Sequence, residues 1–444
     1  MLEILLVGVL GLPLAVSLWL ILNESGPPRY TRWVVSLAAG ATALCALGLL
    51  SFAGQIPPLT LTWLPAAGPM QLSLGITGLY VLTATAAAAA VVFALMAEPL
   101  DTRMGALTLV ALAAGNLAFL AGHFLLRYVA LEVVGLCIAA APLLDPVARQ
   151  RLRHAGWVYL VLRLGDAALL TATLLLGARA GTFEITPALA AVATLPPNVQ
   201  TWISIGFLLA VAVKVGLWPF HAWIESGMRL TRSTYTWLYA TLMPNLGLYL
   251  LYRVAPLAGG LPALRALLLI AGGLTGVALL LTLLRYPDPR RLPARLGILL
   301  TTVVWGLALG WRAEVAWWGL VALTLVRLPF YLRLPATLPS EKASPGWLKP
   351  RYRVQHLAEQ LHSGVEIGLL ERGLTALGQG LPAWAETLYQ RVEQQSLEGL
   401  LRGIVRRTLQ GSRQLRRLHT GRLRANLWWI VLCLALAISW AVFA

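Results

Sequence analysis

Long apolar runs separated by short polar segments make up most of the sequence. The runs are about 20 residues long, the length that an α-helix needs to cross roughly 30 Å of hydrocarbon. Pro, Gly and Arg are frequent in the segments between them, as expected of loops. The pattern predicts about twelve membrane-spanning helices, at 2–22, 33–53, 74–97, 104–121, 124–144, 155–177, 203–223, 234–253, 263–284, 296–311, 315–331 and 426–443.

Composition supports an all-α polytopic membrane protein. Of the 444 residues, 58% are hydrophobic and only 12% are charged, which leaves little of the chain for water-soluble domains. The first run is longer than a signal-peptide core and has Glu3 where a basic region is expected, so it predicts a retained helix. The three cysteines, Cys45, Cys137 and Cys433, lie inside apolar runs without metal or disulfide spacing and are interpreted as packing residues.

The arginines predict an orientation in the membrane. If the N-terminus faces outward, the inner loops hold Arg29, Arg32, Arg103, Arg149, Arg151, Arg153, Arg229, Arg232, Arg285, Arg290, Arg291 and Arg295. The outer segment 54–73 has no Lys or Arg, and 178–200 has only Arg179. The formal net charge of +17 therefore follows the positive-inside rule of a cell inner membrane and gives no support for nucleic-acid binding.

Residues 333–425 interrupt the pattern of membrane spans. They are polar and rich in Arg, but apolar residues recur at helical spacing, for example Leu357, Leu361 and Val365. This predicts an amphipathic helix along the inner membrane surface, followed by a terminal span at 426–444. Two interpretations of the helix are open: a surface linker, and a brace against neighbouring subunits.

Ionisable residues inside apolar runs point to function, because a charge in the hydrocarbon region is costly. They are Glu132, Arg163, Asp166 and Lys214, with His123 and His221 nearer the ends of their runs. The chain has 32 arginines and 3 lysines, and Lys214 is the only lysine before position 342. A buried lysine can gain and lose a proton, whereas arginine stays charged, so Lys214 is predicted to exchange protons, with Glu132 as its partner.

Structural interpretations of these residues are also open. Glu132 and Lys214 can form a static ion pair that joins two helices. Arg163 and Asp166 are three residues apart and can pair along one helix face. His123 lies at the turn between two runs, where a membrane-interface position is the preferred interpretation. His221 follows Pro219, where a kinked helix would free backbone carbonyls and allow a water-lined site.

Three segments together resemble a known family. NLAFLAGHFLLRYVALEVVGLC, VYLVLRLGDAALLTATLLLGARAGTFE and FLLAVAVKVGLWPFHAWIESGM are similar to consecutive stretches of the antiporter-like membrane subunits of bacterial complex I and of multisubunit sodium/proton antiporters. The likeness is greatest to subunit L of complex I, whose lateral helix and terminal span the ending RQLRRLHTGRLRANLWWIVL resembles. The resemblance covers 75–285 well and 355–444 loosely.

The resemblance implies two inverted five-helix repeats, each with a broken helix, and a chain of buried charges that carries protons. Glu132 corresponds to the family's glutamate on the fifth helix, and Lys214 to the lysine of the broken seventh helix. Arg163, Asp166, His221, Tyr239 and His123 are supporting candidates. The family subunit holds no cofactor, metal or active site of its own, and this chain has no Gly-rich phosphate loop or Cys/His ligand set.

The second half departs from the family pattern. Where the family has a Gly-Pro-Thr-Pro turn and then a histidine before alanine, this chain reads MRLTRSTYTWLYATLMPNLGLYLL, with Tyr239 before Ala240. The family's Asp-Ile-Lys-Arg turn is replaced by YPDPRRLPARLGILL, and the following runs have no ionisable residue near their centres. The predicted division is N-terminal helices at 1–100, a first repeat at 101–255, a shortened second repeat at 256–332, the lateral region at 333–425, and the terminal span.

Three functions are compatible with these features. The first is a subunit that conducts or couples protons, or Na⁺, in a translocase of the NADH-quinone oxidoreductase type, assembled with other membrane subunits. The second is an antiporter-like subunit of an inorganic-carbon uptake complex with a soluble zinc-bearing partner. The third is a non-conducting scaffold, which the retention of Lys214 in so lysine-poor a chain argues against.

Overall fold

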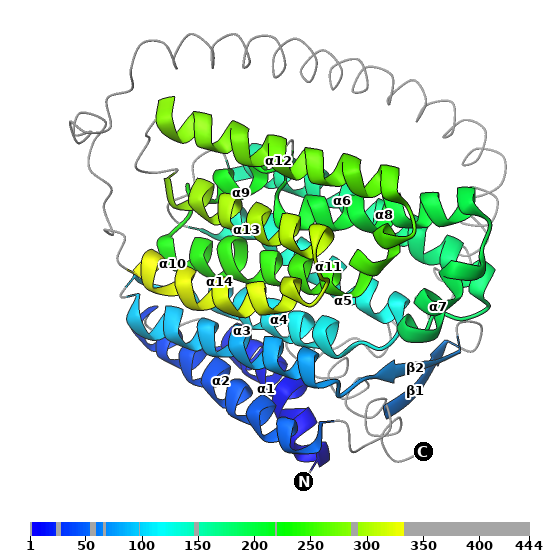
Figure 1. Cartoon of the computed structure of the whole chain (residues 1–444). Helices are drawn as coiled ribbons and strands as arrows, with labels where there is room; N and C mark the ends of the chain where they lie inside the picture. The colour runs from blue at the N-terminus through cyan, green and yellow to red at the C-terminus, as the bar shows by residue number, and fades with distance from the viewer. Residues whose placement is uncertain are drawn as a thin grey trace, which may run out of the picture. The chain divides into compact units, whose positions relative to one another are not determined.

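A computed structural model describes residues 2–23, 28–53, 59–64, 68–96, 98–145, 151–217, 220–285 and 292–332, all within one unit of the chain. This part is almost entirely helical (Figure 1). Its elements are α1 (Leu2–Leu22), α2 (Pro28–Leu49), η1 (Leu50–Phe52), β1 (Leu59–Leu64), β2 (Gly68–Leu72), α3 (Ile76–Leu95), α4 (Thr102–Leu120), α5 (Phe124–Leu144), α6 (Arg151–Ala180), α7 (Ile185–Ala191), η3 (Val192–Thr194), α8 (Pro197–Val215), α9 (Ala222–Gly227), α10 (Arg232–Thr234), η4 (Tyr235–Leu242), α11 (Met243–Gly259), α12 (Pro262–Arg285), α13 (Leu292–Gly310) and α14 (Val315–Leu332).

The predicted polytopic α-helical fold is confirmed. Each of the first eleven apolar runs contains a helix at the expected place, and eight described helices are long and apolar enough to cross a membrane. Shorter apolar helical segments occur at Ala294–Gly310 and Val315–Val326. The lateral region at 333–425 and the span at 426–443 lie outside the described residues, so they stay predictions.

A short antiparallel hairpin was not predicted. Strands β1 and β2 pair from Leu59 opposite Leu72 to Leu64 opposite Gly68, and Leu72 also bridges to Ala121 after α4. The hairpin and α7 lie at one end of the helix bundle and α10 at the other, on the right and left of Figure 1. The two ends of the bundle can therefore be told apart.

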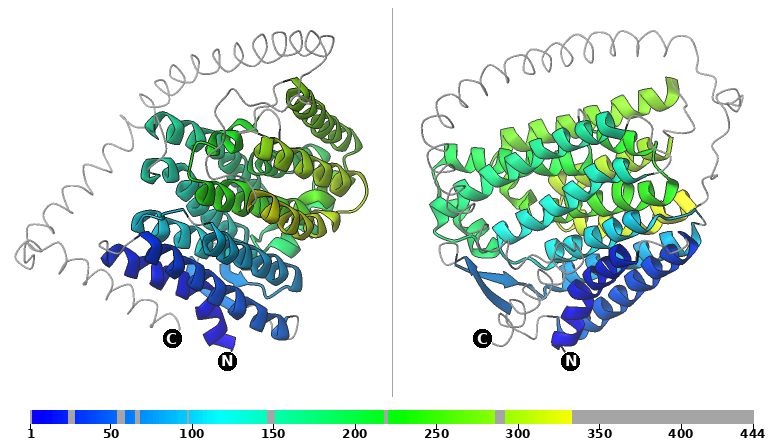
Figure 2. Two further views of the ribbon diagram at one scale, coloured as in Figure 1. Left: turned by 90° about the vertical axis from the view of Figure 1, so that its left-hand side faces the viewer. Right: turned by 180° about the vertical axis from the view of Figure 1, so that it is seen from behind.

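Helices α4 and α5 form the centre of the described unit, and α12 lies at its edge (Figure 2). Small residues allow this close packing, because a glycine or alanine lets two helix backbones approach. A Cβ built on Gly105 of α4 would lie 2.7 Å from Thr31 of α2, and one on Gly115 would lie 2.8 Å from Leu242 of η4. The interior of α4 thus depends on residues without bulky side chains.

The predicted orientation can be tested by cysteine labelling in a cysteine-free background. Asn198 is exposed at the start of α8, at the bundle end with α7, and Arg229 is exposed just after α9, at the opposite end. The excess of arginine in the loops on the side of Arg229 predicts that this end faces the inside. A membrane-impermeant maleimide added to intact cells should label Asn198→Cys and not Arg229→Cys. Labelling of the second variant alone would reverse the topology.

Candidate functional site

The most deeply buried ion pair among the described residues joins α6 to α8. Lys214 Nζ lies 2.5 Å from Asp166 Oδ1, and the exposed fractions of the two side chains are 0% and 2%. The ammonium donates a hydrogen bond to the carboxylate. Asp166 lies in the middle of α6 and Lys214 in the last turn of α8. Both side chains are buried among apolar residues, so each charge depends on the other for stabilisation in a medium where an unpaired charge is costly.

A second ion pair joins α5 to α6, and it lies closer to the surface of the described unit. The Arg163 guanidinium pairs with Glu132, and their side chains are 31% and 12% exposed. Tyr128, one helical turn before Glu132, donates its hydroxyl hydrogen to Glu132 Oε1 at 2.6 Å. Arg163 also lies over the ring of Tyr159, 4.9 Å from its centroid. Sequence reasoning missed Tyr128, although its spacing of four residues from Glu132 was a usable signal.

These partners differ from the predicted ones. We expected Lys214 to pair with Glu132, and Arg163 with Asp166 along one helix face; the structure instead pairs Lys214 with Asp166 and Glu132 with Arg163. The two residues of α6 therefore point to different neighbours, Arg163 to α5 and Asp166 to α8. Arg163 and Asp166 are three residues apart on α6, so the two ion pairs are neighbours, and we call the four side chains the charge cluster.

Glycines explain the observed pairing. A Cβ on Gly165, next to Asp166, would lie 2.9 Å from Val213, next to Lys214. A Cβ on Gly206 would lie 2.8 Å from Ala172. These two close approaches bring α8 against the face of α6 that carries Asp166, and a side chain larger than hydrogen at either position would push the helices apart.

The predicted break between Lys214 and His221 is confirmed, and it begins directly after the lysine. Helix α8 ends at Val215, and α9 begins at Ala222. Gly216 has φ of +71°, its N–H bonds to Val213 O at 3.2 Å, and Leu217 N–H bonds to Ala212 O at 2.9 Å. This is the hydrogen-bond pattern of a Schellman motif, which favours glycine.

The break is also held by a side chain from α9. The indole Nε1–H of Trp223 donates to Val213 O at 2.9 Å, so a carbonyl near the end of α8 is satisfied in the protein interior. Pro219, at which the sequence predicts a kink, lies outside the described residues. Gly216 is the residue that ends the helix in the described structure.

Gly216→Ala should destabilise the protein more than the same change at Gly181. Both glycines have positive φ, +71° and +70°, where alanine costs roughly 1 to 2 kcal/mol. A Cβ at Gly216 would also lie 2.3 Å from Ile224 Cδ1, whereas nothing lies within 4 Å at Gly181. Thermal unfolding of the two variants in detergent separates the contact from the backbone cost, and equal losses would show that the contact with Ile224 yields freely.

Tyr239, one of the supporting candidates predicted from the sequence, lies in an eight-residue π-helix, η4. Such segments carry an extra residue per turn and are frequent at functional sites. The Tyr239 hydroxyl donates to Ile138 O of α5 at 2.9 Å, and its ring lies 5.7 Å from that of Trp223. The phenol thus connects η4 to α5 and to the broken helix.

The two candidate histidines, His123 and His221, lie at opposite sides of the site. His123 precedes α5, forms a β-bridge with Glu184, and is buried with its ring 5.7 Å from that of Phe183. This places it near α7, inside the protein. His221 precedes α9, where its carbonyl accepts hydrogen bonds from Ile224 N–H at 3.0 Å and Glu225 N–H at 3.3 Å.

Other polar groups that sequence reasoning missed fix the helix that carries Tyr239. Asp145 Oδ2 accepts hydrogen bonds from both the N–H and the hydroxyl of Thr231, each at 2.9 Å. Glu98 Oε2 accepts from the N–H of Ser233 at 2.9 Å. Two carboxylates therefore cap the start of α10 and η4, a position where helix dipoles favour negative charge.

Arg127 is a further buried charge inside α5. It donates to Ala118 O at 3.1 Å and to Ala121 O at 2.7 Å, the carbonyls at the end of α4, and it lies over the ring of Tyr249. A guanidinium at a helix C-terminus is stabilised by the dipole. Sequence reasoning missed Arg127, although an arginine inside the apolar run 124–144 was a usable signal of a buried charge. The described residues contain no group of three His, Cys, Asp or Glu side chains that could hold a metal ion.

Comparisons with known proteins agree with this architecture. Residues 121–294 match the family described as NADH:quinone oxidoreductase/Mrp antiporter, TM, and no curated protein matches the chain. A chain of the Mrp complex from Dietzia sp. DQ12-45-1b is similar to 74% of this chain, with 23% identity and a TM-score of 0.65. This chain covers only 37% of that subunit.

Two respiratory complexes also contain similar chains. One is the membrane-bound sulfane sulfur reductase, an archaeal respiratory membrane complex, with 17% identity, a TM-score of 0.61, and coverage of 74% of this chain and 70% of that one. The other is respiratory complex I from Thermus thermophilus, with 23% identity, a TM-score of 0.59, and coverage of 74% and 71%. At these identities the solved structures establish the fold alone. Residues 121–294 thus match the NADH:quinone oxidoreductase/Mrp antiporter transmembrane family, and the described unit shares its fold with chains of the Mrp complex and of respiratory complex I.

Proposed function

We propose that the chain conducts or couples protons as one membrane subunit of a larger complex. The observation that carries this proposal is the fully buried pair of Lys214 and Asp166 at the end of the broken helix. Lysine is the cation that can release a proton there, whereas arginine cannot. The chain otherwise uses arginine almost throughout, which supports a role for the amine itself.

Arg163 provides a physical link between the two ion pairs. It pairs with Glu132 and stands three residues from Asp166, within reach along the helix. If Glu132 is neutralised by a proton, Arg163 can turn to Asp166, and Lys214 then loses its counter-charge and releases its own proton. Protonation at Glu132 and release at Lys214 are thereby coupled without direct contact between the two.

Protons suit this site better than Na⁺. A sodium ion needs several oxygen ligands, and the described carboxylates of the site, Glu132 and Asp166, are each occupied by a cationic side chain. A bound metal cation would have to displace the guanidinium or the ammonium from its carboxylate. A proton needs no set of oxygen ligands, because it binds to the titratable carboxylate or amine itself, and the cationic side chains can then change partners.

The surface around Arg163 supports a partner subunit. Arg163 lies twelve residues into α6, about 18 Å along its axis, so it is far from the helix ends. Its side chain is 31% exposed, and Leu160 and Leu164 beside it are strongly exposed apolar residues. A partly exposed arginine facing lipid at this depth is costly, and contact with a neighbouring membrane subunit would remove that cost.

Proton flux in vesicles tests the proposal. The native complex is isolated through a tag on this chain, its partners are identified by mass spectrometry, and the complex and the chain alone are reconstituted with an internal pH-sensitive dye. We expect flux from the complex, loss of flux in Glu132→Gln, and little flux from the chain alone. Normal flux in the Glu132 variant would exclude the coupling described above. Copurification with a soluble zinc protein in place of membrane subunits would favour inorganic-carbon uptake.

A further inference from the structure

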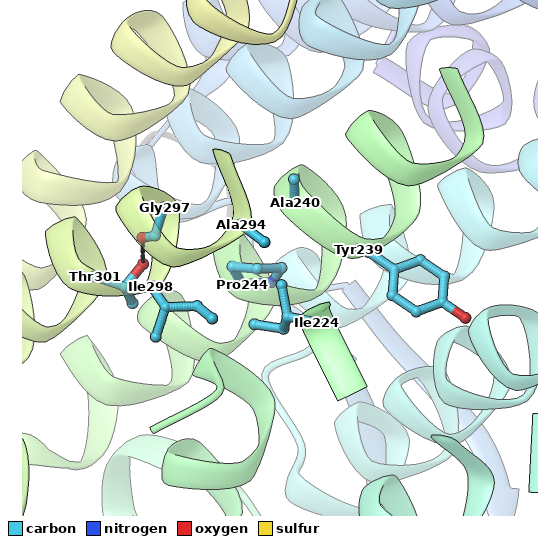
Figure 3. A pocket seen from close by; sticks show the side chains of 8 residues that line it. All are labelled: Ile224, Tyr239, Ala240, Pro244, Ala294, Gly297, Ile298 and Thr301. Carbon is cyan, nitrogen blue, oxygen red and sulfur yellow. Dashed lines mark hydrogen bonds between the residues drawn. The ribbon is translucent and has the colours of Figure 1, made fainter. Parts of the chain in front are cut away.

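A small cavity lies between the broken helix, the π-helix and α13. It is lined by Ile224, Tyr239, Ala240, Pro244, Ala294, Gly297, Ile298 and Thr301 (Figure 3). The space open to the centre of a water molecule is about 10 Å³, which is at the lower limit for one ordered water.

The lining of this cavity offers little to hold a water molecule. The Tyr239 hydroxyl points away from the other labelled side chains in Figure 3 and is bonded to Ile138 O. The Thr301 hydroxyl donates to Gly297 O at 2.8 Å. The remaining side chains are apolar, and an apolar cavity of this size is expected to stay dry.

Ile224 separates the cavity from the turn that follows Lys214. Its side chain lines the cavity on one side, and on the other its Cδ1 lies 2.3 Å from the position of a Cβ built on Gly216. Gly216 is only two residues after Lys214, and Ile224 is 4% exposed. One apolar side chain therefore lies between the cavity and the end of α8.

An ion pair lies next to the cavity, where α9 meets α13. Glu225, next to Ile224, bonds to Arg295, next to Ala294, with Oε1 and Nε 3.0 Å apart. Arg295 also donates to Thr282 O at 3.4 Å. The Glu225 side chain is 13% exposed and that of Arg295 is buried, and both residues stand beside the cavity-lining residues of α9 and α13. Polar groups thus border the cavity at the bundle end that carries α9.

We infer that Ile224 is a hydrophobic gate between the Glu225–Arg295 pair and Lys214. Apolar constrictions close a water path by dewetting, and they open when the space widens or becomes polar. Movement of α9 relative to α13 would widen the cavity and let water reach the Gly216 turn. The inference rests on the proposed function, because it assigns to Ile224 the control of water access to Lys214.

The gate can be tested by hydrogen exchange, with passive proton leak as a second readout. In the assembled complex, amide hydrogen exchange of residues 212–217 reports whether water reaches the end of α8. Ile224→Ser should speed this exchange at least about threefold and produce a passive proton leak in undriven vesicles. Ile224→Leu, which keeps the apolar volume, should do neither. Ile298→Ser is the matched control, because Ile298 lines the same cavity and does not cover Gly216.

The outcomes separate the gate from the proposed function. Faster exchange at 212–217 in the Ile224 serine variant, with the Ile298 variant and the leucine variant at wild-type rates, supports the gate. Equal acceleration in both serine variants, or in neither, overturns it. If proton flux proves independent of Lys214, the proposed function fails, and the exchange result then still shows whether Ile224 excludes water from the turn.

Discussion

Lys214→Arg should stop proton flux while the complex still assembles. Guanidinium keeps the positive charge and can still bond to Asp166, but it does not release its proton. Proton transfer by a positioned side chain contributes about 100-fold or more to a rate, so we expect flux to fall by about that factor. The measurement is dye-reported flux in vesicles that contain the partner subunits, with assembly followed by gel filtration.

The alternative is that Lys214 only balances a buried carboxylate. In that case the arginine variant would assemble and conduct like wild type. Wild-type flux with normal assembly would therefore reject the proton-exchange role of Lys214 and favour the scaffold interpretation.

The helices could be predicted from the sequence because each apolar run has the length of a membrane span. The Gly216 turn and the β1–β2 hairpin were harder to predict, since each depends on only a few residues. The turn lies within a run that stays apolar on both sides of it, and the hairpin lies between two runs. The π-helix at Tyr235–Leu242 was invisible, because one extra residue in a turn leaves a fully buried segment equally apolar. Pattern alone therefore predicts where helices cross and not how their backbones deviate.

The members of the charge cluster could be predicted, and their partners could not. A costly charge inside an apolar run stands out in any sequence. Which charges meet depends on the rotation and separation of helices, and here Gly165 and Gly206 set how closely α6 approaches α8. The two glycines can be read from the sequence, but the close helix contact that they allow cannot. It depends on the facing residues Val213 and Ala172, which are distant from them in the sequence.

The observed pairing makes a second prediction, about the free energy of unfolding. Lys214→Met leaves Asp166 as a buried carboxylate without a partner, and Asp166→Leu leaves a buried ammonium. Each should destabilise the protein by about 3 to 5 kcal/mol, the usual cost of removing one member of a buried pair. The double variant should recover most of that loss, since it replaces the pair with apolar side chains in an apolar interior, and it should still lack proton flux.

A double-mutant cycle makes this test quantitative, because the recovery in the double variant measures the coupling between the two side chains. Thermal and denaturant unfolding in detergent supply the four stabilities. The control cycle combines Lys214→Met with Glu132→Gln, the partner expected from the sequence but not found in the structure. Because Glu132 is paired with Arg163, we expect no rescue there. Rescue of Lys214→Met by Glu132→Gln, and none by Asp166→Leu, would overturn the observed pairing and restore the one predicted from the sequence.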